Sequence, residues 1–190
     1  SAPVLGSFAV GIVCLAAYIK RQLSIKTPVL DLRVFTYQGY RVGVMCLMLN
    51  FGITLAAMYV LPQFYQNAML IAVAAAGVLM LPGGLINAAV SVAAGTLFDR
   101  FGARGPVSIG FACSALASAM LMVATPQTPI WYMVACHIIM MIGVPLAMSP
   151  CQTHALASLP PQLNSDGSTL MNTLQQVLGA ICTAVATCLL

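Results

Sequence analysis

Three charged side chains, Asp99, Arg100 and Arg104, stand close together between two long apolar stretches of the sequence. A carboxylate just before a helix start accepts hydrogen bonds from the free N–H groups of the first turn and is favoured by the helix dipole. The two arginines can pair with that carboxylate or with anionic lipid headgroups, and Gly95 and Gly102 let two helix backbones approach and turn sharply. This pattern predicts a short loop that latches two helices together. An anchor held at the membrane surface by positive charge explains the same spacing equally well.

Few other side chains with acid–base chemistry lie within the apolar stretches. The sequence contains three acidic residues, and these are Asp31, Asp99 and Asp166, all in the charged segments. His137 lies inside an apolar stretch, and an imidazole changes its charge near neutral pH, which makes His137 a candidate proton relay or substrate contact. The alternative is an imidazole that is hydrogen-bonded to a neighbouring helix.

Two amides and two aromatic side chains in the apolar stretches add hydrogen-bonding groups and adaptable surface. Asn50 and Asn87 each either point a hydrogen-bond donor into a substrate cavity or join two helices. Phe51 and Tyr59 supply the kind of apolar and aromatic surface that promiscuous binding proteins use. Together with His137, these four residues are the candidate lining of a substrate cavity.

Nothing in the sequence indicates catalysis or a metal centre. The sequence has no glycine-rich phosphate loop, no GxSxG elbow and no HExxH motif. His154 has Cys151 three residues before it, but no further ligand at metal-binding spacing. We therefore expect no catalytic residues, no cofactor and no bound metal.

Composition places the chain in a lipid bilayer. Hydrophobic residues make up 61% of the sequence and charged residues 5%, whereas roughly a quarter of a soluble domain is charged. The net charge of +4 forms no basic stripe, which argues against nucleic acid as a partner. A membrane β-barrel would need strands of alternating polar and apolar residues, which are absent. The sequence therefore predicts an all-α integral membrane protein.

The spacing of the charges predicts the topology. Charged residues fall within 20–41, within 99–104 and at Asp166, and the stretches 42–98 and 105–165 have none. Each uncharged stretch is long enough for two spans of about 20 residues. All three charged groups therefore share one face of the membrane. Because every Lys and Arg lies there, this face should be cytoplasmic.

About six transmembrane helices follow from these stretches. Their expected ranges are 3–19, 42–62, 68–94, 105–124, 129–149 and 170–190. Polar segments that contain proline indicate hairpin tips at 62–67 and 125–129. Within the third helix, Pro82 removes an intrahelical hydrogen bond, and Gly83 and Gly84 permit close packing, so we predict a bend there. The alternative is ordinary variation within a membrane helix.

The segment around Asp99 resembles the signature loop of the major facilitator superfamily, G-x-L-x-D-R-x-G-x-[RK]. The residues at the matching positions are Gly95, Leu97, Asp99, Arg100, Gly102 and Arg104. Further segments resemble the fourteen-helix drug:proton antiporter subfamily, namely 30–35, 61–66, 81–84, 159–163 and 172–177. The resemblance covers nearly the whole chain.

The resemblance implies a partial C-terminal half of a major facilitator fold. Residues 1–19 would end a linker helix, 20–41 would form a cytoplasmic linker, and 42–190 would supply five helices of the half-bundle. A missing N-terminal half would carry the acidic groups that couple transport to protons. In this family the second, third, fifth and sixth helices of the chain would face the central cavity, which favours Asn50 and His137 as substrate contacts.

The absence of an initiating Met and the apolar residues at the end of the sequence also favour a fragment. On this interpretation the chain is a multi-pass protein of the cell inner membrane, and the N-terminal half of the same transporter is its partner. The transporter would exchange small amphipathic substrates, such as drugs, for protons by alternating access. The alternative is a non-transporting six-helix membrane scaffold or assembly subunit, in which the signature-like segment is only an anchor.

Overall fold

The computed structural model describes the backbone of residues 2–24 and 30–189, and the side chains of residues 6, 10–14, 16–21 and 30–185. The α-helices of the described residues are α1 (Ala2–Ser24), α2 (Gln38–Gln63), α3 (Val73–Phe101), α4 (Arg104–Met122), α5 (Ile130–Ala157) and α6 (Asn164–Leu189). Short 3-10 or π-helical turns are η1 (Leu32–Thr36), η2 (Phe64–Ala68) and η3 (Pro161–Leu163). The prediction of an all-α fold with about six helices is confirmed.

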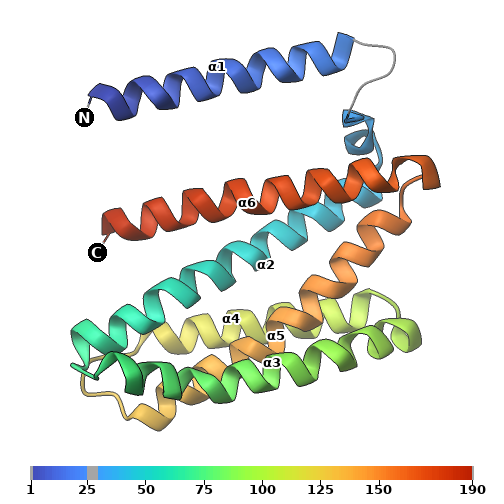
Figure 1. Ribbon diagram of the computed structural model, residues 1–190. Coiled ribbons are helices and arrows are strands. Elements are labelled where there is room, and N and C mark those ends of the chain that lie inside the picture. The colour runs from blue at the N-terminus through green and yellow to red at the C-terminus, as the bar shows by residue number, and fades with distance from the viewer. Residues whose placement is uncertain (1, 25–29, 190) are drawn as a thin grey trace.

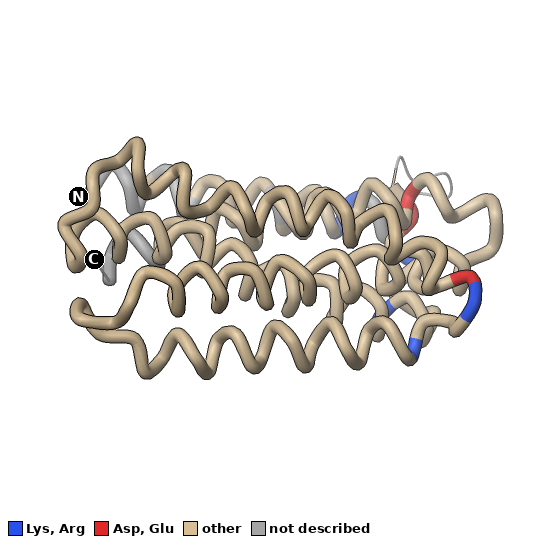
Figure 2. Tube along the Cα trace, turned by 90° about the horizontal axis from the view of Figure 1, so that it is seen from below, with Lys and Arg blue, Asp and Glu red and all other residues tan. Residues whose placement is uncertain are grey.

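Helices α2 to α6 pack together, α1 lies apart from them, and successive helices alternate in direction along the chain (Figure 1). Among the described residues, four helices are long and apolar enough to cross a membrane, namely α2 with η2, α3, α4 and α5. Helix α1 begins, and α6 ends, on the same side of the molecule (Figure 1). The charged residues gather toward one end of the bundle (Figure 2). The bundle therefore has one charged end.

Several helices extend beyond the ranges expected from the sequence. The later ends are Ser24 for α1, Phe101 for α3 and Ala157 for α5, and the earlier starts are Gln38 for α2 and Asn164 for α6. The expected ranges stop at polar residues because about 20 residues fill the hydrocarbon layer. A helix can continue beyond the hydrocarbon layer because its backbone hydrogen bonds also form there, and the extra turns carry polar side chains. The expected linker 20–41 accordingly contains the end of α1, η1 and the start of α2, while residues 1, 25–29 and 190 lie outside the described residues.

The first hairpin tip lies later than expected. Pro62 is inside α2, and the chain continues as the π-helical turn η2, where Asn67 Nδ2 donates to Gln63 Oε1 at 2.9 Å. The chain reverses at 69–72, where Leu70 has a φ of 55°. The expected tip at 62–67 is wrong because a proline removes a single helical hydrogen bond, which the surrounding turns tolerate here.

Helix α5 is the central helix of the bundle. It packs against α2, α3 and α4, which make few contacts with one another. Small residues bring the backbones together, as they do in many membrane proteins. A Cβ atom at Gly110 of α4 would lie 2.7 Å from the carbonyl oxygen of Gly143 in α5, and one at Gly43 of α2 would lie 2.7 Å from Cβ of Ala155. The bundle is therefore organised around α5.

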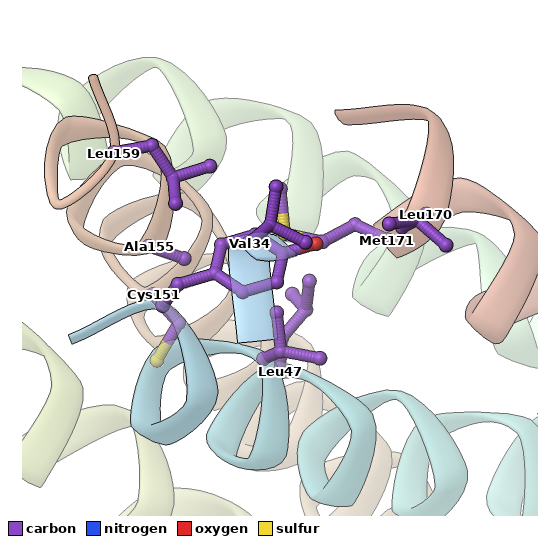
Figure 3. Packing of buried hydrophobic residues seen from close by; sticks show 9 residues of the cluster. Val34, Leu47, Cys151, Ala155, Leu159, Leu170 and Met171 are labelled. Carbon is purple, nitrogen blue, oxygen red and sulfur yellow. The ribbon is translucent and has the colours of Figure 1, made fainter. Parts of the chain in front are cut away.

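A cluster of buried apolar side chains lies near the charged end (Figure 3). It joins η1, α2, α5 and α6, and consists of Val34, Tyr40, Val44, Leu47, Cys151, Ala155, Leu159, Leu170 and Met171. Tyr40 Oη donates to the carbonyl oxygen of Gly167 at 2.8 Å in this buried region. The carboxylate of Asp31 caps η1 by accepting from the Arg33 N–H at 2.9 Å. The segment before α2 is thus packed into the bundle through Val34.

Candidate functional site

A groove with a polar lining runs between α3 and α5. These helices run in the same direction (Figure 1). They touch where Gly83 faces the ring of His137, and where Asn87 Nδ2 donates to the carbonyl oxygen of Met141 at 3.2 Å. The groove lies beside this contact and extends from it toward the charged end, with a volume of about 260 Å³. Its lining consists of Asn87, Ser91, Val144, Pro145, Met148, Ser149, Gln152 and Thr153.

The polar side chains of the groove keep free hydrogen-bonding capacity. Ser91 Oγ donates to the carbonyl oxygen of Asn87 at 2.7 Å, and Thr153 Oγ1 donates to that of Ser149 at 3.0 Å. Each hydroxyl oxygen can still accept a hydrogen bond. Gln152 is half-buried, and no described residue forms a hydrogen bond with its amide. The groove therefore offers donors and acceptors without a charged side chain.

The predicted cavity residues do not all come together in this groove. Asn87 lines it, whereas Asn50 and His137 are 0% and 4% exposed inside the bundle. Phe51 and Tyr59 are half-buried on α2 and are not part of the lining. The amide of Asn50 and Nδ1 of His137 have no hydrogen-bond partner among the described residues. Asn87 also joins two helices, which was the alternative interpretation of this amide.

Gln152 and Thr153 fall in a loop when the sequence is read alone, because the expected fifth helix ends at 149. Helix α5 instead continues to Ala157, so Gln152 stands one turn after Ser149 on the same face. A stronger stop signal does occur later in the sequence, at Pro160 and the proline that follows it. That signal, rather than the first polar residue, would have placed Gln152 on the helix.

Two larger grooves are lined mostly by apolar side chains. One of about 390 Å³ lies between α2, α4 and α5 and includes Phe64 and Met133. The other, of about 520 Å³, lies between α2 and α6 and includes Met45 and Leu178. Both lack the convergent polar groups that orient a ligand in a binding site. The groove between α3 and α5 is therefore the candidate site.

The predicted latch segment forms the turn between α3 and α4. Asp99 lies in the last turn of α3, so the expectation that it caps the next helix is wrong, because α3 continues beyond it. No ion pair joins Asp99 to Arg100 or Arg104, and these three described side chains are all exposed. Gly102 has a φ of 70° and forms the sharp turn that the sequence predicted. These three charged groups are therefore exposed at the end of the bundle, and the latch role of the turn stays a prediction.

A family model matches the chain across the latch segment and the helices on both sides of it. This model describes the Major Facilitator Superfamily and matches residues 4–183. The chain belongs to the Major Facilitator Superfamily. The resemblance that the segment around Asp99 indicated is therefore confirmed. No solved structure gave a significant match to this major facilitator chain.

Curated relatives of this major facilitator chain include bacterial drug-resistance proteins. The chain is 40% identical to the Lincomycin resistance protein LmrB of Listeria innocua, over 98% of this chain and 40% of that protein. It is 35% identical to the LmrB of Bacillus subtilis, over 98% and 39%. It is 26% identical to the Multidrug export protein EmrB of Haemophilus influenzae, over 94% and 35%. The chain spans about two fifths of the length of these relatives.

The glycines of α3 differ in their surroundings within this major facilitator chain. The helix stays continuous through Pro82, Gly83 and Gly84. Gly83 is buried against His137, whereas a Cβ atom at Gly84 or at Gly95 would meet nothing within 4 Å. The close approach expected at Gly95 is therefore absent among the described helices, because no helix lies against that face. The bend at Pro82 stays a prediction, and Gly83 is the glycine that permits close packing.

Proposed function

We propose that this chain is part of a proton-coupled exporter of small amphipathic compounds that works by alternating access. Membership of the Major Facilitator Superfamily supports transport, and similarity to lincomycin resistance and multidrug export proteins supports export of drug-like compounds. The observation that carries the proposal is the groove between α3 and α5, which places uncharged hydrogen-bonding groups in an apolar bundle. A non-transporting scaffold does not require such a groove.

This chain would supply one wall of the transport pathway and the conformational turn between α3 and α4. The acidic groups that exchange protons would belong to the N-terminal half of the same transporter. Asp31, Asp99 and Asp166 lie before η1, in the last turn of α3 and in the first turn of α6, so none is at the centre of a span. A coupling carboxylate must meet the substrate pathway inside the membrane.

The charged end of the bundle would face the cytoplasm in a multi-pass protein of the cell inner membrane. The described basic residues lie toward that end (Figure 2), and an excess of Lys and Arg marks cytoplasmic loops. In this orientation the exposed carboxylate of Asp99 would contact the other half of the transporter in one of its two conformations. Such a contact would hold the cytoplasmic side closed and release it during each cycle.

The substitution Asp99→Asn in the full-length transporter tests this proposal. Asparagine keeps the size of the side chain and removes the charge. Coupling between two sites typically changes an equilibrium constant about 5-fold to 150-fold. We therefore expect loss of the Asp99 charge to lower lincomycin efflux roughly tenfold. The matched control is Asp166→Asn, which removes an acidic charge at the same end of the bundle, in the first turn of α6.

The measurement is lincomycin efflux and resistance in cells that lack their own drug exporters, at equal amounts of each variant in the membrane. Wild-type transporter and Asp166→Asn should protect the cells, and Asp99→Asn should not. If Asp99→Asn protects the cells fully, the proposed conformational role of the turn is rejected. Absence of any efflux by the wild type, across lincomycin and other amphipathic drugs, would reject export as the function.

A further inference from the structure

We infer that Gln152 is a specificity-determining residue, which with Ser149 and Asn87 binds an uncharged hydrogen-bonding group of the exported compound. This inference rests on the proposed function, because it concerns which substrates the exporter accepts. The groups that fit are hydroxyls and amides, since the three side chains offer both donors and acceptors. A permanently cationic group would find no counter-ion on this wall.

The extension of α5 beyond residue 149 brings these side chains together. Ser149 and Gln152 are three residues apart, so they lie on one face of the helix. Asn87 faces them across the groove from α3, where its Nδ2 is held by the carbonyl oxygen of Met141. This bond restrains the amide and leaves the Asn87 side-chain oxygen as an unused acceptor.

The Gln152 amide has the largest unused hydrogen-bonding capacity of the lining, because its oxygen accepts and its nitrogen carries two donors, whereas the Ser149 hydroxyl, which also has no bond with a described residue, carries one donor. The hydroxyls of Ser91 and Thr153 already donate to carbonyl oxygens of their own helices. Gln152 is half-buried, and its amide has no hydrogen bond from any described residue. A bound ligand would displace water from this half-buried amide, and a ligand group that pairs with the amide avoids the cost of leaving it without a partner. The amide therefore selects for a ligand that can donate and accept.

The lining carries no charged side chain. The acidic residues of the chain lie outside the groove, with Asp99 in the last turn of α3 and Asp166 in the first turn of α6. A site built from neutral amides and hydroxyls rejects analogues that lack the matching hydrogen-bonding group more strongly than it rejects changes in apolar size. We therefore expect Gln152 to affect hydroxylated substrates and to leave apolar cations unaffected.

The test measures export of two fluorescent probes by the full-length transporter in inverted membrane vesicles. Riboflavin is an uncharged compound with a hydroxylated chain, and trimethylammonium-diphenylhexatriene is a permanent cation without hydrogen-bonding groups. The variant is Gln152→Leu, which removes the amide and keeps a similar volume. The matched control is Gln162→Leu, the same substitution at an exposed position in η3, outside the groove.

For Gln152→Leu we expect the KM for riboflavin to rise roughly tenfold, as the loss of one or two neutral hydrogen bonds would produce. The maximal rate for riboflavin and both parameters for trimethylammonium-diphenylhexatriene should stay within about twofold of the wild type, as should all parameters of Gln162→Leu. An unchanged KM for riboflavin overturns the inference. So does an equal loss for both probes, which would mean that Gln152 serves the structure or the transport cycle.

The same experiment separates this inference from the proposed function. A wild-type transporter that exports trimethylammonium-diphenylhexatriene and not riboflavin keeps the proposed function and overturns the role of the groove in binding uncharged groups. A wild-type transporter that exports neither probe, nor lincomycin, rejects export itself and the inference with it.

Discussion

Two adjacent glycines of α3 provide a test of the packing between α3 and α5. Gly83 is buried, and a Cβ atom there would overlap the His137 ring and lie 3.1 Å from Cγ of Met141. A Cβ atom at the neighbouring Gly84 would meet nothing within 4 Å. We therefore expect Gly83→Ala to destabilise the protein and Gly84→Ala to leave its stability unchanged or raise it.

The size of the difference follows from two opposing contributions. Replacing glycine by alanine inside a helix is favourable by roughly 0.5–1 kcal/mol, and this gain is the same at both positions. Inserting a methyl group into a packed interface costs about 1–3 kcal/mol, and this cost applies only at Gly83. The two variants should therefore differ by about 1–3 kcal/mol, with Gly83→Ala the less stable.

The assay compares melting temperatures of the two purified variants of the full-length transporter in the same detergent. A third variant, Gly83→Ala with His137→Ala, removes the ring that the new methyl group meets. Its loss of stability should be smaller than the sum of the two single losses, since residues in contact are not additive. The reasoning is refuted if Gly83→Ala melts at or above Gly84→Ala, because the predicted overlap would then have no energetic cost.

Two further substitutions concern buried polar groups. Tyr40→Phe removes the hydrogen bond to the carbonyl oxygen of Gly167 and leaves that oxygen without its donor, so we expect a loss of about 1–2 kcal/mol in thermal unfolding. Tyr37→Phe, at an exposed position, should leave the melting temperature unchanged. Equal melting temperatures for Tyr40→Phe and Tyr37→Phe would contradict the hydrogen bond assigned to Tyr40. Asn50→Leu removes a fully buried amide that has no partner among the described residues, so we expect stability to rise by about 1 kcal/mol. A lower melting temperature for Asn50→Leu would show that the amide is paired in the full-length protein.

The arrangement of the charged end could be predicted because charge in hydrocarbon is costly. The positions of Asp99, Arg104 and Asp166 limit where the chain can leave the membrane, and the uncharged stretches between them set the number of crossings. Gly102 was also predictable as a turn residue, since a short connection between two helices needs a positive φ. These features depend on whether each segment lies in water or in lipid, and the composition of each segment indicates which of the two surrounds it.

The polar groove could not be predicted, because it depends on where helices end and which faces meet. Gln152 appeared to lie in a loop, since the polar residues after 149 leave the hydrocarbon layer even though α5 continues. Asn50 and Asn87 look alike in sequence, yet Asn50 faces the interior and Asn87 lines the groove. Which amide meets a ligand depends on the rotation of each helix about its axis, and nearly uniform apolar sequence does not reveal this rotation.

The central place of α5 has a consequence for the synthesis of the protein. The ribosome completes α2, α3 and α4 before it reaches Ile130, where α5 begins, and chains emerge from their N-terminal end first. Until α5 enters the bilayer, the three earlier helices have few contacts with one another and are surrounded by lipid. A nascent chain that stops before Ile130 would therefore be inserted in the membrane and still unassembled, so assembly of these helices waits for α5, the fifth of the six described α-helices.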